Sequence, residues 1–131
     1  MRFKFPLRIR MFLLGIGGGK PESMYGEKLL RFLADFLKKR LKENPHTMQE
    51  LGEEAFASMQ SPNNARMGTY ILLRVWQRKG GVDISDGGLV TWRRNVPVKL
   101  DRLANVNWRF ILENWETPGY KEQIETILKG V

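Results

Sequence analysis

The chain has 131 residues, of which 42% are hydrophobic and 27% are charged, and it contains no cysteine. This length and composition fit one globular domain and argue against global disorder, while the lack of cysteine excludes disulfides, thiol nucleophiles and thiolate metal sites. The net charge of +8 and a pI near 10.0 favour a polyanionic partner such as nucleic acid.

The excess of positive charge lies in two stretches of the sequence. Residues 1–23 carry five basic side chains and one acidic one, and residues 61–94 carry six basic and two acidic ones, so each stretch contributes +4. Residues 24–60 and 95–131 are neutral, with six and five charges of each sign, respectively. The two basic stretches are therefore the first candidates for a surface that binds a polyanion.

Residues 1–23 are interpreted as a basic, glycine-rich leader or arm. Its basic side chains alternate with apolar ones and would share one face of an extended strand; they are Arg2, Lys4, Arg8 and Arg10. The arm would lie on nucleic acid or an anionic membrane; the alternative, which we favour, is a loosely ordered leader ending at Gly15–Gly19. Its apolar run is too short for a transmembrane helix, which needs about twenty residues. A phosphate-binding loop is excluded because Pro21 follows Lys20.

Leucine and phenylalanine side chains recur at helical spacing between residues 29 and 41 and predict a helix over about 26–43. Asn44-Pro45 ends it, because proline disfavours the helical conformation in the residue before it. Basic residues at positions 38–42 lie in the last turn, where the helix dipole favours cations. We interpret them as a solvated helix end, with contact to phosphate as the alternative.

A second helix is predicted to start at Thr47. Its hydroxyl can accept a hydrogen bond from the Glu50 amide while the Glu50 carboxylate reaches back to Thr47, which is a capping box. Met48, Leu51 and Ala55 provide the inward face, and a short turn at Ser58–Gln60 follows. His46, the only histidine, is interpreted as a turn residue, because one imidazole makes a histidine-based metal site or catalytic triad improbable.

A third helix is predicted over residues 61–79, with Ser61 as its cap and Pro62 in its first turn. The predicted inward side consists of Ala65, Gly68, Thr69, Leu72, Leu73, Val75 and Trp76. The opposite side contains no acidic residue and consists of Asn63, Arg66, Met67, Tyr70, Arg74, Gln77 and Arg78. Arginine pairs with guanine, and asparagine or glutamine with adenine, in the major groove of DNA. Any surface helix also has a polar face, so this face alone does not indicate DNA binding.

A β-hairpin is predicted after this helix. Gly80 and Gly81 end the helix, Val82–Ser85 and Leu89–Arg94 form the strands, and residues 86–88 form the turn between them. Arg93 and Arg94 lie at the base of the hairpin. Helix, helix, basic helix and hairpin thus succeed one another in a single unit, and this combination favours nucleic-acid binding more than the polar face does.

This order resembles the winged helix-turn-helix superfamily of DNA-binding proteins, over about residues 24–96. The resemblance implies that residues 61–79 form the recognition helix and residues 82–94 the wing. The chain departs from the superfamily in one respect: wing tips that enter DNA often carry a basic residue, whereas the turn here carries Asp86. The candidate nucleic-acid contacts are Asn63, Asn64, Arg66, Met67, Tyr70, Arg74, Gln77, Arg78, Arg93 and Arg94. The expected fold is mainly α with a small β-hairpin, plus C-terminal helices.

Residues 97–131 are predicted to form a helical extension. A short helix is expected at Pro97–Ala104, a stripe of apolar residues runs from Trp108 to Trp115, and Thr117-Pro118 would cap a final helix ending at Gly130. Its balanced charge makes it a poor DNA surface. We favour packing on the core; the alternative is a homodimer through exposed Trp108 and Trp115.

The leading hypothesis is a duplex DNA-binding protein, a small regulator of transcription or of a mobile element, in the cytoplasm or nucleoid. The alternatives are a non-catalytic helical adaptor in a larger assembly and a single-stranded nucleic-acid binder that stacks bases on Tyr70 and Trp92. We expect no enzymatic activity, metal or cofactor, because no nucleophile motif or metal-ligand spacing occurs.

Overall fold

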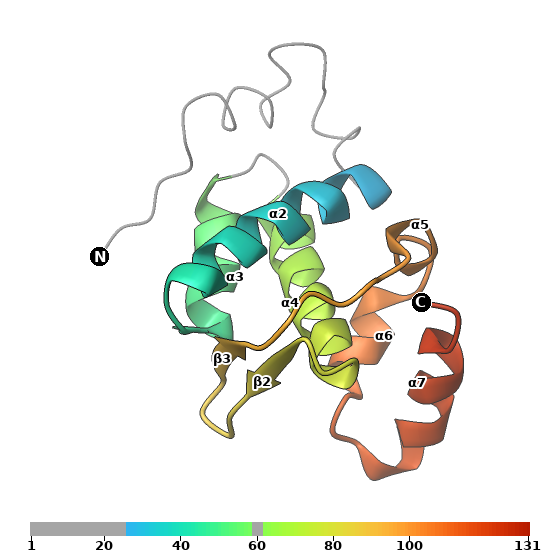
Figure 1. Ribbon diagram of the computed structural model, residues 1–131. Coiled ribbons are helices and arrows are strands. Elements are labelled where there is room, and N and C mark those ends of the chain that lie inside the picture. Colours follow the sequence, from blue (N-terminus) through green and yellow to red (C-terminus); the bar gives the residue numbers. More distant parts are fainter. Residues whose placement is uncertain (1–25, 59–61) are drawn as a thin grey trace.

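The computed structural model describes residues 26–58 and 62–131, which form a mainly helical fold with one small antiparallel sheet (Figure 1). This confirms the predicted mainly α class with a hairpin. The predicted basic arm, the predicted Ser61 cap and residues 59–60 of the predicted turn lie outside these residues. Within the described ranges, no helix is both long and apolar enough to cross a membrane.

Helix α2 spans Glu27–Glu43, as predicted to within one residue. Asn44 ends it with an extended backbone (φ −156°, ψ 154°), which is the conformation that a following proline favours. The buried residues recur every three or four positions and form one face; they are Leu29, Leu30, Leu33, Ala34, Phe36, Leu37 and Leu41. This face packs against helix α4 (Pro62–Arg78).

Helix α3 spans Met48–Ser58 and begins with the predicted capping box. The Glu50 amide donates to Thr47 Oγ1 at 3.0 Å, and the Thr47 amide donates to Glu50 Oε1 at 3.0 Å. The hydrogen bond from the Thr47 backbone lowers the pKa of the Glu50 carboxyl below its ordinary value. Leu51 and Ala55 are fully buried, and Met48 packs at the edge of the core.

The prediction that His46 is a turn residue is wrong. His46–Thr47 form strand β1, in which His46 pairs with Val90 and Thr47 with Leu89. A strand of two residues has no alternation to reveal it, and its partner lies far along the chain. The start of α3 is therefore attached to the hairpin.

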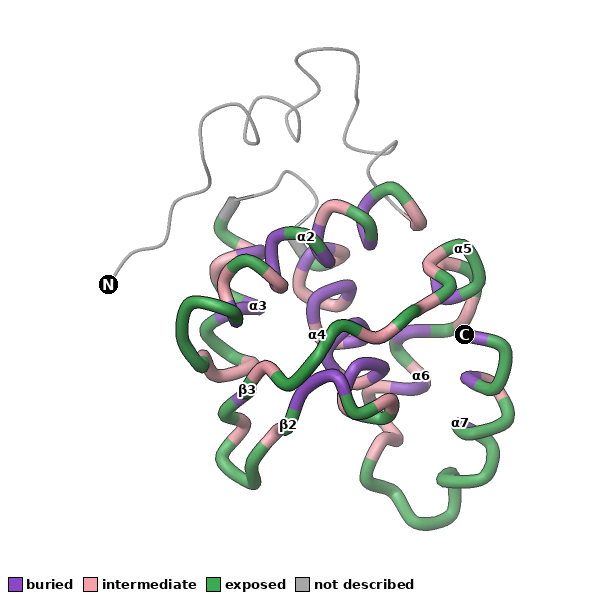
Figure 2. Tube along the Cα trace, in the orientation of Figure 1, coloured by how far each residue is buried: buried purple, intermediate pink, exposed green. Residues whose placement is uncertain are grey.

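Helix α4 lies at the centre of the fold and packs against α3, α2, α6 (Trp108–Glu113) and β2 (Val82–Ile84). The seven residues of the predicted inward side are all buried, and Ile71 joins them (Figure 2). A Cβ atom at Gly68 would lie 2.7 Å from Leu33 Cδ1, so glycine is what lets α2 approach α4 closely here. The hydrophobic core is built around this helix.

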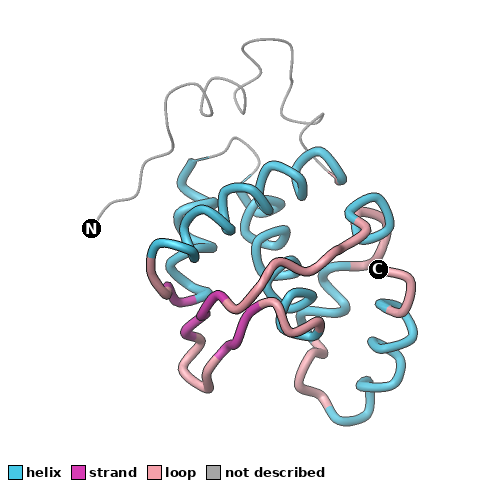
Figure 3. The backbone as a smooth tube through the Cα atoms, viewed as in Figure 1, coloured by secondary structure: helices cyan, strands magenta, loops and turns pink. Residues whose placement is uncertain are grey.

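Strands β2 and β3 (Leu89–Trp92) form the predicted hairpin, and β1 adds to it in the order β1-β3-β2 (Figure 3). Val82 and Val90 point into the core. Gly88 closes the turn with φ 86°, a left-handed conformation that glycine adopts without strain. The chain after β3 then runs without regular structure to α5 (Leu100–Leu103).

The C-terminal region consists of α5, α6, a 3₁₀ turn η2 (Pro118–Tyr120) and α7 (Lys121–Leu128). It packs on the core, as favoured from the sequence, because α6 contacts α4 and α5 contacts α2. The first of these helices starts three residues later than predicted, and the Thr117 side chain makes no cap hydrogen bond.

The alternative of a homodimer through an exposed Trp108 is wrong. Trp108 is only 3% exposed, and its indole Nε1 donates to the Leu103 carbonyl oxygen at 2.7 Å. It is therefore a core residue and not a dimer contact. Trp115 is half-buried. A single stripe of apolar residues cannot show whether it faces its own core or a second chain, which is why the sequence left both options open.

We expect Thr47→Ala to lower the free energy of unfolding by about 1 kcal/mol, because the Glu50 amide loses its capping partner. Urea denaturation monitored by circular dichroism measures the change. Thr47→Ser keeps the hydroxyl and should retain most of the stability. If the alanine variant and the wild type have equal free energies of unfolding, the capping box does not contribute to stability.

Candidate nucleic-acid interface

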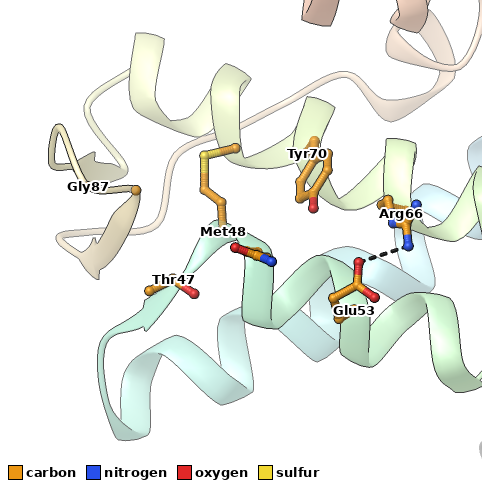
Figure 4. Close-up of a pocket in the computed structure, with 8 residues that line it drawn as sticks. Thr47, Met48, Glu53, Arg66, Tyr70 and Gly87 are labelled. Atoms are coloured by element: carbon orange, nitrogen blue, oxygen red, sulfur yellow. Dashed lines mark ion pairs between the residues drawn. The ribbon is translucent and has the colours of Figure 1, made fainter.

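An open groove of about 480 Å³ separates the first half of α4 from the turn of the hairpin, with the start of α3 as its floor. Arg66 and Tyr70 of α4 lie along one side, and Gly87 lies across the groove (Figure 4). The groove is lined by Thr47, Met48, Gln49, Glu53, Arg66, Tyr70, Gly87 and Gly88. It lies where the winged-helix resemblance would place a recognition helix beside a wing.

Backbone hydrogen bonds fix the hairpin turn against the start of α3. The Met48 amide donates to the Gly88 carbonyl oxygen at 2.8 Å, which joins the turn to the first residue of the helix. Within the turn, the Gly88 amide donates to the Ser85 carbonyl at 2.9 Å, and the Leu89 amide donates to Ser85 Oγ at 3.0 Å. The groove therefore has fixed walls rather than a free loop on one side.

Arg66 is the cation inside the groove, and it already has partners. Its Nη2 lies 2.8 Å from Glu53 Oε1, and its guanidinium lies 4.1 Å from the ring centroid of Phe56. The two charged side chains keep 33% and 52% of their surfaces exposed. An ion pair this exposed contributes about 0–1 kcal/mol to stability, so the guanidinium can exchange Glu53 for another anion at low cost.

The second half of the predicted contact face is covered by the C-terminal region. Arg74 donates to Gln77 Oε1 at 3.0 Å and lies 5.5 Å from the ring centroid of Trp115. Burial lowers the pKa of the Arg74 guanidinium below its ordinary value, and Glu116 opposes the shift. Arg78 forms an ion pair with Glu125 of α7 at 2.7 Å. These arginines attach α4 to the C-terminal helices.

The acidic partners of α4 could not be found by reading α4 alone. Its polar face contains no carboxylate, as the sequence indicates, but α3 supplies Glu53 and α7 supplies Glu125. Both lie on other helices, and Glu125 is 47 positions from Arg78. Only the packing of the helices brings these charges together.

The hairpin arginines differ from each other. Arg93 pairs with Asp83 across the hairpin at 2.5 Å, with both side chains largely exposed. Arg94 is exposed and has no carboxylate within 4.0 Å in the part of the chain that the structure describes. A Cβ atom at Gly80 would lie 3.2 Å from Arg94 Nη2, which places this guanidinium at the end of α4.

The remaining candidate residues differ in how far they are exposed to solvent. Asn63 is exposed, whereas Asn64, Met67 and Gln77 are half-buried, and Met67 packs against the core. Neither ring proposed for stacking bases is fully free. Tyr70 packs closely over Gly52, and Trp92 meets Trp76 edge to face with centroids 6.2 Å apart.

Tyr70 offers a test of how enclosed the groove is. Burial raises the pKa of the Tyr70 phenol above its ordinary value, and the nearby Arg66 guanidinium opposes the shift. A raised pKa favours the neutral phenol in the folded protein, so this stabilisation is complete below pH 10.0 and is lost as the pH rises through the folded-state pKa.

We therefore expect Tyr70→Phe to remove a late phenolate transition and to reduce the alkaline loss of stability. Ultraviolet absorbance titration and urea denaturation at a series of alkaline pH values measure the two effects. Tyr120→Phe removes a phenol outside the groove and is the matched control. If Tyr70→Phe instead removes a phenolate transition from the early, less alkaline part of the titration, burial does not raise the pKa of Tyr70.

Within residues 26–58 and 62–131, no group of three or more histidine or acidic side chains is placed to hold a metal ion. Comparison of the chain with protein-family models, with curated proteins and with solved structures gave no match.

Proposed function

We propose that this protein binds nucleic acid, with duplex DNA preferred, through a winged-helix arrangement of α2, α3, α4 and the β2–β3 hairpin. The observation that carries the proposal is the groove itself, because the first half of α4 and the hairpin turn border one open space with fixed walls. The order of helix, helix, basic helix and hairpin supports it as well. A small regulator of transcription or of a mobile element would use such a domain.

The structure divides the residues of α4 between two roles in this proposal. Readout of bases belongs to the first half of the helix, where Asn63 is exposed and Arg66 and Tyr70 line the groove. Arg74 and Arg78 instead face the C-terminal region, where Arg74 lies by Trp115 and Arg78 pairs with Glu125. The contact surface on α4 is thus shorter than residues 61–79. The hairpin contributes mainly through the two arginines at its base, Arg93 and Arg94.

A gel-shift titration of duplex DNA, single-stranded DNA and RNA at two salt concentrations tests the proposal. Duplex DNA should bind most tightly, and binding should weaken steeply with salt because cations on the protein release counterions from phosphates. Tighter binding of single strands would favour base stacking instead. Absence of binding to all three at low salt would refute nucleic-acid binding.

A non-catalytic adaptor is the second candidate function, and one observation favours it. A hollow of about 420 Å³ near the C-terminus is lined by apolar Trp115, Pro118 and Ile124 together with charged neighbours. An apolar hollow with a few charged groups suits a segment of a protein partner. For an adaptor, we expect binding to a protein partner that does not depend on salt, and no binding of DNA at low salt.

We expect Glu53→Gln to strengthen DNA binding by about fivefold, or roughly 1 kcal/mol. The substitution removes a negative charge from the groove and releases Arg66 from its ion pair. Fluorescence anisotropy with labelled duplex at low salt measures the affinity. Glu122→Gln makes the same change in net charge on α7 and should have no more than a small effect. Equal gains in both variants would show a general charge effect and not a groove effect.

A further inference from the structure

We propose that a second surface, formed by Lys38 and Lys42 of α2 and by Arg94 after β3, contacts the phosphate backbone of the nucleic acid. The inference rests on the proposed function, and it names a contact that lies away from the groove. The sequence alone favoured a solvated helix end for these lysines. Within the described residues, three features of the fold argue for more than that: their placement over tryptophan rings, their lack of carboxylate partners, and an unpaired arginine whose backbone is tied through Gly81 to Trp76.

The two lysines are held over a pair of tryptophans. They are one turn apart on α2 and point to the same side. Lys38 Nζ lies 5.9 Å from the ring centroid of Trp76, and Lys42 Nζ lies 5.3 Å from that of Trp92. The two indoles meet edge to face at 84°. Cation–π contacts restrict the flexible lysine side chains and leave the ammonium hydrogens available to a ligand.

The charges of this surface are not neutralised by neighbouring acids. In the described ranges, Lys38, Lys42 and Arg94 have no carboxylate within 4.0 Å. Arg40, between the two lysines in sequence, pairs with Glu54 at 2.9 Å. Lys39 is left out of the surface because, in the described ranges, it does not lie over either tryptophan ring as Lys38 and Lys42 do.

Arg94 joins the lysines because the chain after β3 is tied to the end of α4. The Arg94 amide donates to the Gly81 carbonyl at 3.1 Å, and the Gly81 amide donates to the Trp76 carbonyl at 2.7 Å. Helix α2 packs against β3, which ends at Trp92 (Figure 1). The backbone of Arg94 is therefore tied through Gly81 to Trp76, which carries the ring under Lys38, while the Arg94 guanidinium lies beside Gly80 at the end of α4.

The spacing of the lysines suits a phosphate backbone. Residues four apart on a helix are separated by about 6 Å along its axis, at about 1.5 Å per residue. Phosphates of one DNA strand advance about 3.4 Å per nucleotide along the duplex axis and also turn around it, so two such lysines can reach neighbouring phosphates of one strand. A membrane is a poorer match, because the apolar face of α2 is buried against the core and leaves nothing to insert between lipids.

The test compares Lys38→Gln/Lys42→Gln with Lys121→Gln/Lys129→Gln, which removes the same charge from exposed positions at α7. Glutamine is a good helix former, so both variants should stay folded, and the α2 variant should melt slightly lower because it loses two cation–π contacts. Duplex DNA affinity is measured by anisotropy over a series of salt concentrations. The α2 variant should bind at least tenfold more weakly at low salt, and its slope of log affinity against log salt should fall by about 1.8, or about 0.9 per lost phosphate contact. The α7 variant should keep the wild-type slope.

The outcomes separate this inference from the proposed function. If the wild type binds duplex DNA and the two variants behave alike, the inference is wrong and the groove proposal stands. If the wild type binds no nucleic acid, both fail. Vesicles of phosphatidylcholine with and without phosphatidylserine form a second arm. The inference would be overturned if the anionic vesicles retain the wild type but not Lys38→Gln/Lys42→Gln, while both bind DNA equally well. The surface would then be assigned to lipid.

Arg94→Gln provides an independent check of the third cation. Its loss should reduce the salt slope by about half as much as the double variant does, since one phosphate contact is removed. Arg109→Gln is its matched control, because Arg109 is exposed on α6 and lies outside the proposed contacts. An unchanged slope for Arg94→Gln would remove Arg94 from the surface, and an equal loss for Arg109→Gln would show a general charge effect and overturn the assignment of Arg94.

Discussion

Helix α4 is enclosed by α3, α2 and α6, and the placement of its polar side chains depends on this enclosure. A buried polar or charged group is costly unless it finds a partner. Arg66, Arg74 and Arg78 each meet an acid, an amide or an aromatic ring at the edge of the helix interface. Three buried side-chain atoms of the described residues have no hydrogen-bond partner: Thr69 Oγ1, His46 Nε2 and Arg66 Nε, although the Arg66 guanidinium pairs with Glu53 through Nη2.

The enclosure divides the cations of the protein into two groups. Arginines around α4 are used to join helices, and their charge is largely balanced by Glu53 and Glu125. Lysines at the end of α2 lie over indole rings instead, with their charge intact. Net charge by segment cannot make this distinction, because it counts both groups equally. The neutral stretch at residues 24–60 therefore supplies two of the three cations of the candidate phosphate surface, and the basic stretch at residues 61–94 supplies one.

The features that the sequence predicted correctly are local ones. The capping box of Thr47 and Glu50, the end of α2 at Asn44 and the glycine turn of the hairpin each depend on residues within four positions of one another. The inward face of α4 was predicted from periodicity alone. The features that were missed involve partners that are distant in the chain: the pairing of His46 with Val90, and the acids that reach α4 from α3 and α7. No pattern within one element encodes them.

The hydrogen bond between the Met48 amide and the Gly88 carbonyl has a kinetic consequence. It joins the start of α3 to a turn that is synthesised much later, so the groove cannot form while the nascent chain is still short of the hairpin. Contacts of such long range are completed after local helices in most folding reactions. The groove is accordingly completed only after α3 and the hairpin have both formed. A ligand bound in the groove would stabilise the folded hairpin against local unfolding.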